Sequence, residues 1–81
     1  MQKKTPQIRL GLYRHYKGLD YEVIGVANHS ESLEEMIVYK ALYDAEPFGK
    51  NALWVRPCKM FFENVIVDGK EVPRFEFVKE R

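Results

Sequence analysis

Aromatic and basic side chains alternate in one short stretch near the start of the chain, Tyr13-Arg14-His15-Tyr16-Lys17. In an extended strand, Tyr13, His15 and Lys17 point to one face, and Arg14 and Tyr16 point to the other. Aromatic rings stack on bases, and cationic groups neutralise phosphates or carboxylates. The stretch therefore predicts a surface for an anionic or aromatic ligand. The alternative is a half-buried strand whose tyrosines pack and whose charges are solvated.

A second aromatic–basic pair lies in Trp54-Val55-Arg56-Pro57. Trp54 and Arg56 alternate onto one strand face, where a guanidinium can stack on a ring and still present its fork to an anion. Arg74 is a further candidate anion contact. The alternative is that Trp54 fills the core, Arg56 pairs with a carboxylate such as Glu63, and Arg74 forms an ion pair on an edge strand.

The polar run His29-Ser30-Glu31 contains the side-chain types of a nucleophilic triad. Consecutive residues cannot form one, because neighbouring side chains point apart and a triad is assembled across a fold. The alternative is a polar turn in which Ser30 or Ser32 bonds backbone N–H groups and a carboxylate orients His29. An enzyme that uses His15 or His29 as general base requires a histidine about 3 Å from a carboxylate.

Two histidines flank a predicted hairpin, so His15 and His29 are also possible ligands of a divalent metal, together with Glu22 or Glu31. Their spacing matches no metal motif, and the single cysteine, Cys58, adds little to the set. We therefore expect no metal site and no cofactor.

The composition indicates one folded domain. The chain has 81 residues, of which 46% are hydrophobic and 14% aromatic, and this length is enough for one domain and not for two. The net charge of +1, from 13 basic and 12 acidic residues, lacks the basic excess typical of a general nucleic-acid binder. A local basic patch is still compatible with this balance, because net charge says nothing about clustering.

The cysteine count and the hydropathy pattern predict a cytoplasmic location. One cysteine cannot form an internal disulfide, which fits a reducing compartment. The polar N-terminus is followed by no apolar segment typical of a secretory signal. No apolar run approaches the roughly 20 residues that span a bilayer, so we expect no membrane partner.

Short strands joined by tight turns dominate the pattern. The six predicted strands are residues 12–17, 21–27, 36–43, 52–56, 65–67 and 72–78. Asp68-Gly69 is a strong hairpin signal, and Gly25 within a strand predicts a bulge, a bend or a close backbone approach. Residues 33–43 also show helical spacing, but the β-branched and aromatic Ile37-Val38-Tyr39 favours a strand, which leaves at most one helical turn at 31–34.

These elements predict an all-β fold, a small, bent, antiparallel barrel of five or six strands. No strand–helix–strand unit is long enough for a parallel crossover, and a curled antiparallel sheet is the simplest arrangement that remains. One short helical or 3₁₀ turn within residues 57–63 is expected to plug the barrel with Met60, Phe61 and Phe62. We expect a flexible arm at residues 1–11, followed by a single SH3-like barrel domain at residues 12–81.

Several stretches together resemble a known family of small, mainly bacterial proteins, the domain-of-unknown-function family 1653. The matching stretches are Tyr13-Arg14-His15-Tyr16-Lys17-Gly18, His29-Ser30-Glu31, Val38-Tyr39, Leu42-Tyr43, Leu53-Trp54-Val55-Arg56-Pro57, Met60-Phe61 and Val72-Pro73-Arg74-Phe75. The resemblance covers roughly residues 12–75 and implies an SH3-like barrel. Similar proteins occur alone or fused to enzymes of nucleotide or cofactor metabolism. No activity is established for the family, so the resemblance implies no catalytic residue.

The favoured functional hypothesis is a binding module. In it, Arg14, Tyr16, Trp54 and Arg56 line a shallow groove for a nucleotide, a short nucleic acid or a peptide. The full set of candidate contacts is Arg14, His15, Tyr16, Lys17, His29, Glu31, Trp54, Arg56 and Arg74. One alternative is a protein–protein interaction or structural subunit, a monomer or weak homodimer that pairs through a sheet edge or through exposed Phe48, Phe75 and Phe77. A small histidine-dependent enzyme is the other.

Overall fold

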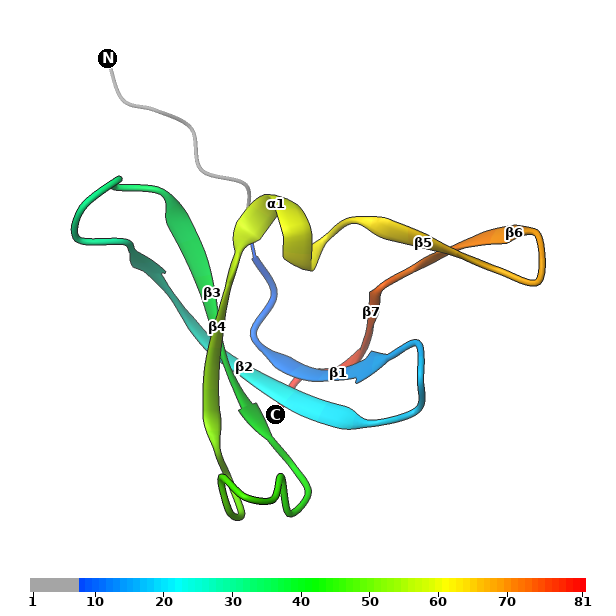
Figure 1. The fold of residues 1–81 in the computed structure, drawn as a ribbon, viewed down its shortest axis with the longest axis horizontal. Coiled ribbons are helices and arrows are strands. Elements are labelled where there is room, and N and C mark those ends of the chain that lie inside the picture. Colours follow the sequence, from blue (N-terminus) through cyan, green and yellow to red (C-terminus); the bar gives the residue numbers. More distant parts are fainter. Residues whose placement is uncertain (1–7) are drawn as a thin grey trace.

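The computed structural model describes residues 8–81 and is almost entirely β (Figure 1). Its elements are β1 (Gly11–His15), β2 (Asp20–Asn28), β3 (Glu35–Ala41), β4 (Leu53–Pro57), α1 (Cys58–Phe61), β5 (Asn64–Val67), β6 (Lys70–Pro73) and β7 (Phe75–Lys79). All pairings between these strands are antiparallel. The predicted all-β class and the predicted short helical turn are both confirmed.

Five strands form one curled sheet in the order β4-β3-β2-β1-β7, and β5 and β6 form a separate hairpin. Figure 1 shows this hairpin extending to one side of the sheet. The two edge strands of the sheet, β4 and β7, do not pair with each other within residues 8–81. The expected barrel is therefore an open, curled sheet, and α1 directly follows its edge strand β4.

One face of the curled sheet, called the inner face below, carries nearly all of the large aromatic side chains of the strands. Residues directly opposite each other on paired strands share a face. The strand register thus places on the inner face Tyr13, His15, Tyr21, Val23, Ile37, Tyr39, Trp54, Arg56, Phe75 and Phe77.

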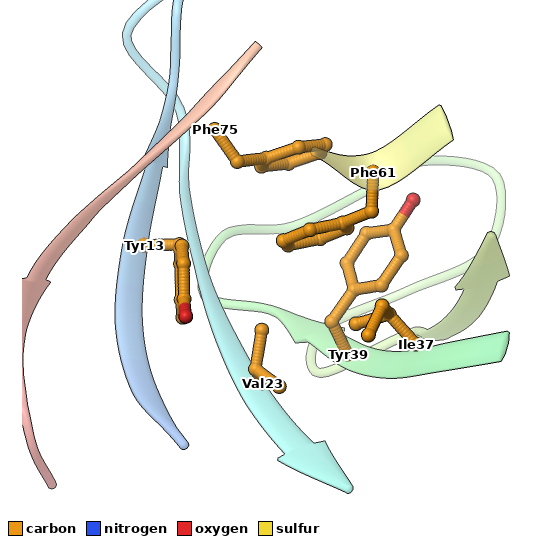
Figure 2. Close-up of a cluster of buried hydrophobic side chains, with 6 residues drawn as sticks. All are labelled: Tyr13, Val23, Ile37, Tyr39, Phe61 and Phe75. Atoms are coloured by element: carbon orange, nitrogen blue, oxygen red, sulfur yellow. The ribbon is translucent and has the colours of Figure 1, made fainter. Parts of the chain in front are cut away.

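The hydrophobic core lies between the inner face and α1. Its buried members are Tyr13, Val23, Ile37, Tyr39, Phe61 and Phe75 (Figure 2). The ring of Phe61 lies parallel to that of Phe75, with 4.1 Å between their centroids. A helix of four residues has no independent stability in water, so this packing holds α1 in place. Only Phe61 plugs the core, because Met60 and Phe62 are about half exposed.

Two predicted backbone features are present. The pairing of β2 with β3 shifts by one residue between Val23 and Gly25, which is the bulge that Gly25 predicted. Asp68 and Gly69 both have positive φ angles, 50° and 79°. A two-residue hairpin turn of type I′ requires this conformation at both central positions.

One strand prediction differs from the structure. The predicted strand 72–78 is divided into β6 and β7 at Arg74. Pro73 has no N–H to continue the ladder, and the Arg74 N–H donates to the Glu63 carbonyl instead. Between β2 and β3, the Leu33 N–H donates to the carbonyl of His29, four residues earlier. This connection is a single turn, which agrees with the prediction of at most one helical turn at 31–34. The other strand ends lie within two residues of the prediction.

The segment before β1 contacts the inner face. Ile8 packs against the core, the guanidinium carbon of Arg9 lies 3.8 Å from the centre of the Phe77 ring, and the Tyr13 hydroxyl donates to the Arg9 carbonyl. The rest of the predicted arm, residues 1–7, lies outside the described residues. Among residues 8–81, no helix has the length and apolar character needed to cross a membrane.

Candidate functional site

His15, Arg56 and Phe75 converge at one end of the inner face, although they come from three different strands. The His15 and Phe75 rings have centroids 4.9 Å apart, and the guanidinium carbon of Arg56 lies 5.6 Å from the centre of the Phe75 ring. Arg56 Nε also donates a hydrogen bond of 3.3 Å to the Tyr39 hydroxyl. Since Phe75 stacks on Phe61 as well, it joins the core to this polar end.

The surroundings of His15 are positively charged. Burial lowers the pKa of His15 below its ordinary value of 6.5, and the charges of Arg56, Lys17 and Arg74 lower it further. Arg74 is offset by an ion pair of 3.1 Å with Glu63, while Arg56 and Lys17 form no ion pair within residues 8–81. These four residues, His15, Lys17, Arg56 and Arg74, are called the basic cluster below.

Three linked tyrosines, Tyr21, Tyr39 and Tyr43, border the basic cluster. The hydroxyls of Tyr21 and Tyr43 lie 2.6 Å apart, and the Tyr21 ring contacts those of His15 and Tyr39. Burial and the bond to Tyr43 raise the pKa of Tyr21, so its hydroxyl keeps its proton. Because the Tyr39 oxygen accepts from Arg56, its own O–H remains free to donate.

Two buried nitrogen donors of the inner face and its border, Trp54 Nε1 and Arg74 Nε, have no hydrogen-bond partner among residues 8–81. An unsatisfied buried donor costs about 1–3 kcal/mol. Such groups are rare in native proteins, and each one marks a place where a bound polar group or water is favourable. Both donors belong to residues that the sequence singled out as candidate contacts.

Arg14 and Tyr16 line a hollow of ≈ 440 Å³ between the β1–β2 turn and the β5–β6 hairpin, and His15 lines it too, with its ring centroid 4.6 Å from that of Tyr16. Arg14 points to the outer face and forms an ion pair of 2.8 Å with Asp20. In the sheet, β2 and β3 separate β1 from β4. The predicted groove is not one hollow, because Arg14 and Tyr16 line this one whereas Trp54 lines another beside the loop after β3. His15 is the β1 residue that reaches both this hollow and the Phe75 ring near Arg56.

His29 and Glu31 follow the far end of β2, opposite the end that pairs with β1 and His15. The two histidines are apart because β1 pairs with only the first four residues of β2. His29 Nδ1 accepts the N–H groups of Glu31 and Ser32 at 3.1 and 3.3 Å, so backbone groups orient it instead of the predicted carboxylate. The Ser32 hydroxyl accepts the Glu34 N–H, as predicted for a polar turn.

The described residues offer little support for acid–base or metal chemistry. Neither histidine has a carboxylate partner within residues 8–81. His15 Nδ1 accepts the Lys17 N–H at 3.2 Å instead. In the same part of the chain, no group of three His, Cys, Asp or Glu side chains is placed to hold a metal ion.

Sequence reasoning missed the tyrosines of the site, Tyr21, Tyr39 and Tyr43. The strand pattern includes Tyr39, and the family-matching stretches include Tyr39 and Tyr43, but neither marks these residues as contacts. The available signal was the alternation in β3, where Ile37, Tyr39 and Ala41 share the buried face. That pattern places the ring of Tyr39 inside but does not reveal that its hydroxyl meets Arg56.

These features define a small, curled β domain whose inner face ends in a cluster of basic and aromatic side chains. Residues 11–77 match the family described as "Protein of unknown function (DUF1653)", and the chain belongs to this family. The motif resemblance is thus confirmed. A crystal structure of a DUF1653 protein from Bordetella bronchiseptica is similar over 91% of each chain, with a TM-score of 0.82 and 32% identity. The comparison with curated proteins gives no match.

Proposed function

We propose that the domain is a small binding module that recognises an anion, a phosphate or a carboxylate, at the basic cluster. The observation that carries this proposal is the convergence of Arg56 and His15 on Phe75. The charge of Arg74 also acts on His15, so three cationic or protonatable groups lie at this end of the inner face. The chain as a whole has a net charge of only +1, which makes this local excess notable.

The guanidinium N–H donors of the basic cluster suit an anion that presents two oxygen atoms, such as a phosphate or a carboxylate. Arg56 donates from Nε to the Tyr39 hydroxyl. Its two terminal guanidinium nitrogens can therefore make a bidentate contact with two oxygens of an anion. The neighbouring phenol O–H groups supply neutral donors, and the aromatic surroundings favour an anion joined to a planar ring. A nucleoside monophosphate combines both features. The single cysteine, Cys58, fits a reducing compartment, and we place this function in the cytoplasm.

An NMR titration of the ¹⁵N-labelled protein with AMP and with inorganic phosphate tests the proposal. We expect saturable shifts at His15, Arg56 and Phe75, and a stronger response to AMP than to phosphate. Arg56→Met should abolish them. Arg14→Met is the matched control, because it removes the same charge from an exposed arginine outside the cluster. Absence of shifts with both ligands, or equal losses in both variants, would refute the proposal.

A second candidate function, a protein-interaction subunit, rests on the edge strand β4. Leu53 and Val55 on its outer face are 62% and 59% exposed, and an unpaired strand edge is a template for another strand. Of the phenylalanines predicted to be exposed, only Phe48 is, since Phe75 is buried and Phe77 is half-buried. Light scattering across a concentration series, with Val55→Lys as comparison, tests self-association. A strict monomer at high concentration excludes it.

A further inference from the structure

A second hollow, of ≈ 480 Å³, lies where the loop after β3 folds over β4. It is lined by Tyr43, Asp44, Ala45, Glu46, Phe48 and Trp54, and is called the aromatic hollow below. Its volume lies within the roughly 300–1,000 Å³ typical of small-molecule sites. The lining contains three aromatic rings and two carboxylates and no basic side chain. In charge it is the opposite of the basic cluster.

Two of the three rings of the aromatic hollow are perpendicular to each other. Phe48 and Trp54 have centroids 5.1 Å apart and ring planes 80° apart. Phe48 is 65% exposed, so burial in the core does not explain a phenylalanine at this position. Tyr43 is fixed separately by its hydroxyl bond to Tyr21.

The loop that carries Phe48 is held by its own backbone. The Ala45 N–H donates to the Gly49 carbonyl at 3.0 Å, and the Phe48 N–H donates to the Ala45 carbonyl. Asp44 and Lys50 form an isolated bridge at the base of the loop. A loop that is ordered before binding loses less conformational entropy when a ligand arrives.

The two carboxylates of the aromatic hollow differ in their surroundings, because Asp44 also lines a neighbouring hollow with Lys50 and Arg81, whereas Glu46 does not. Asp44 and Glu46 form no ion pair with any side chain among residues 8–81. Their negative charge adds to the negative faces of the three rings. Aromatic faces attract large organic cations, and quaternary ammonium groups are the known ligands of such ring sets. The absence of basic side chains from the lining disfavours an anion here.

We propose that the aromatic hollow is a binding site for an organic cation, an alkylammonium group of the trimethylammonium type. The rings of Tyr43, Phe48 and Trp54 would contact the methyl groups, and Asp44 and Glu46 would offset the charge. The site goes beyond the anion-binding function proposed above. It uses no residue of the basic cluster, shares only Tyr43 with the tyrosines that border that cluster, and can be tested independently of that function.

The experiment uses choline and its neutral isostere, 3,3-dimethylbutan-1-ol, as probes. Trp54 is the only tryptophan of the chain, so its fluorescence and its indole N–H resonance both report on this hollow. We expect saturable changes in these signals with choline. The neutral isostere should bind at least several-fold more weakly, because it has the same shape without the charge.

Two substitutions separate the roles of ring and charge. Phe48→Leu keeps an apolar side chain and removes one ring face, so we expect choline affinity to fall about two- to fivefold. Glu46→Gln should weaken choline binding and reduce its salt dependence. Phe62→Leu is the matched control, since Phe62 is an exposed phenylalanine outside the hollow, and it should leave binding unchanged.

Three outcomes overturn the proposal: no response of either Trp54 signal to choline, equal binding of choline and its neutral isostere, or equal effects of Phe48→Leu and Phe62→Leu. Arg56→Met separates the two proposed sites. Choline binding should persist in this variant while AMP binding is lost. Failure of one ligand alone therefore refutes one site and leaves the other in place.

Discussion

Truncation of Phe61 should destabilise the domain more than any other substitution in α1. The side chain is fully buried, stacks on Phe75 at 4.1 Å, and makes edge contacts with Tyr13 and Tyr39 at 5.5 and 5.4 Å. Phe→Ala substitutions in cores cost about 3–5 kcal/mol. At about 0.05–0.15 kcal/mol per residue, a domain of this size has a total stability of roughly 4–12 kcal/mol. Phe61→Ala therefore removes much of that stability.

Urea unfolding followed by Trp54 fluorescence measures this effect. With a slope of about 1 kcal/mol per molar urea, the midpoint of Phe61→Ala should fall by about 3 M, or the variant should be unfolded in buffer. Phe61→Leu should cost less than about 1.5 kcal/mol, because it largely conserves volume. Phe62→Ala, at a position 44% exposed, is the matched control. If both alanine variants lose the same small amount, Phe61 does not plug the core.

The remaining predictions concern the backbone, a pKa and a hydrogen bond. Gly11→Ala should lower the free energy of unfolding in urea by more than about 2 kcal/mol, because φ is 139° and a Cβ would lie 2.5 Å from the Lys79 carbonyl of β7. Gly25→Ala is the control and should be nearly neutral, since a Cβ there meets nothing within 4 Å. NMR titration should place the pKa of His15 below 6.5. The unfolded state then binds more protons, so stability should fall as the pH drops through 6.5, and His15→Asn should flatten that slope. Tyr43→Phe should cost about 0.5–1.5 kcal/mol in urea unfolding by removing the hydroxyl bond to Tyr21.

Local sequence signals predicted the strands and turns well, because each depends on a few neighbouring residues. Asp68-Gly69 specifies its turn through the positive φ angles that these residues tolerate. The β-branched run at residues 37–39 correctly outweighed the helical spacing around it. The division at Arg74 was missed, since it depends on a bond from its N–H to the carbonyl of Glu63, eleven residues earlier.

The site was harder to predict, because it depends on which strands become neighbours. β7 pairs with β1, and this contact between the two ends of the chain brings Phe75 opposite His15. Alternation along β1 correctly places Arg14 and His15 on opposite faces, but it cannot show which of them lies near Arg56. A tyrosine in a strand also gives the same signal whether it fills the core or borders a site. Tyr39 does both, with a buried ring and a hydroxyl that meets Arg56.

The near-neutral charge of the chain hides a separation of charge along the inner face. The 13 basic and 12 acidic residues almost cancel, which argued against a general nucleic-acid binder. At the end of β1, however, Arg56, Lys17 and Arg74 act on one histidine. The lining of the aromatic hollow has two carboxylates and no basic side chain. Tyr43 lines the aromatic hollow, and its hydroxyl is hydrogen-bonded to that of Tyr21, which lies beside His15. The aromatic hollow and the basic cluster are therefore connected through this pair of tyrosines. Such a surface can discriminate between small charged ligands by position, which a uniformly basic surface cannot do.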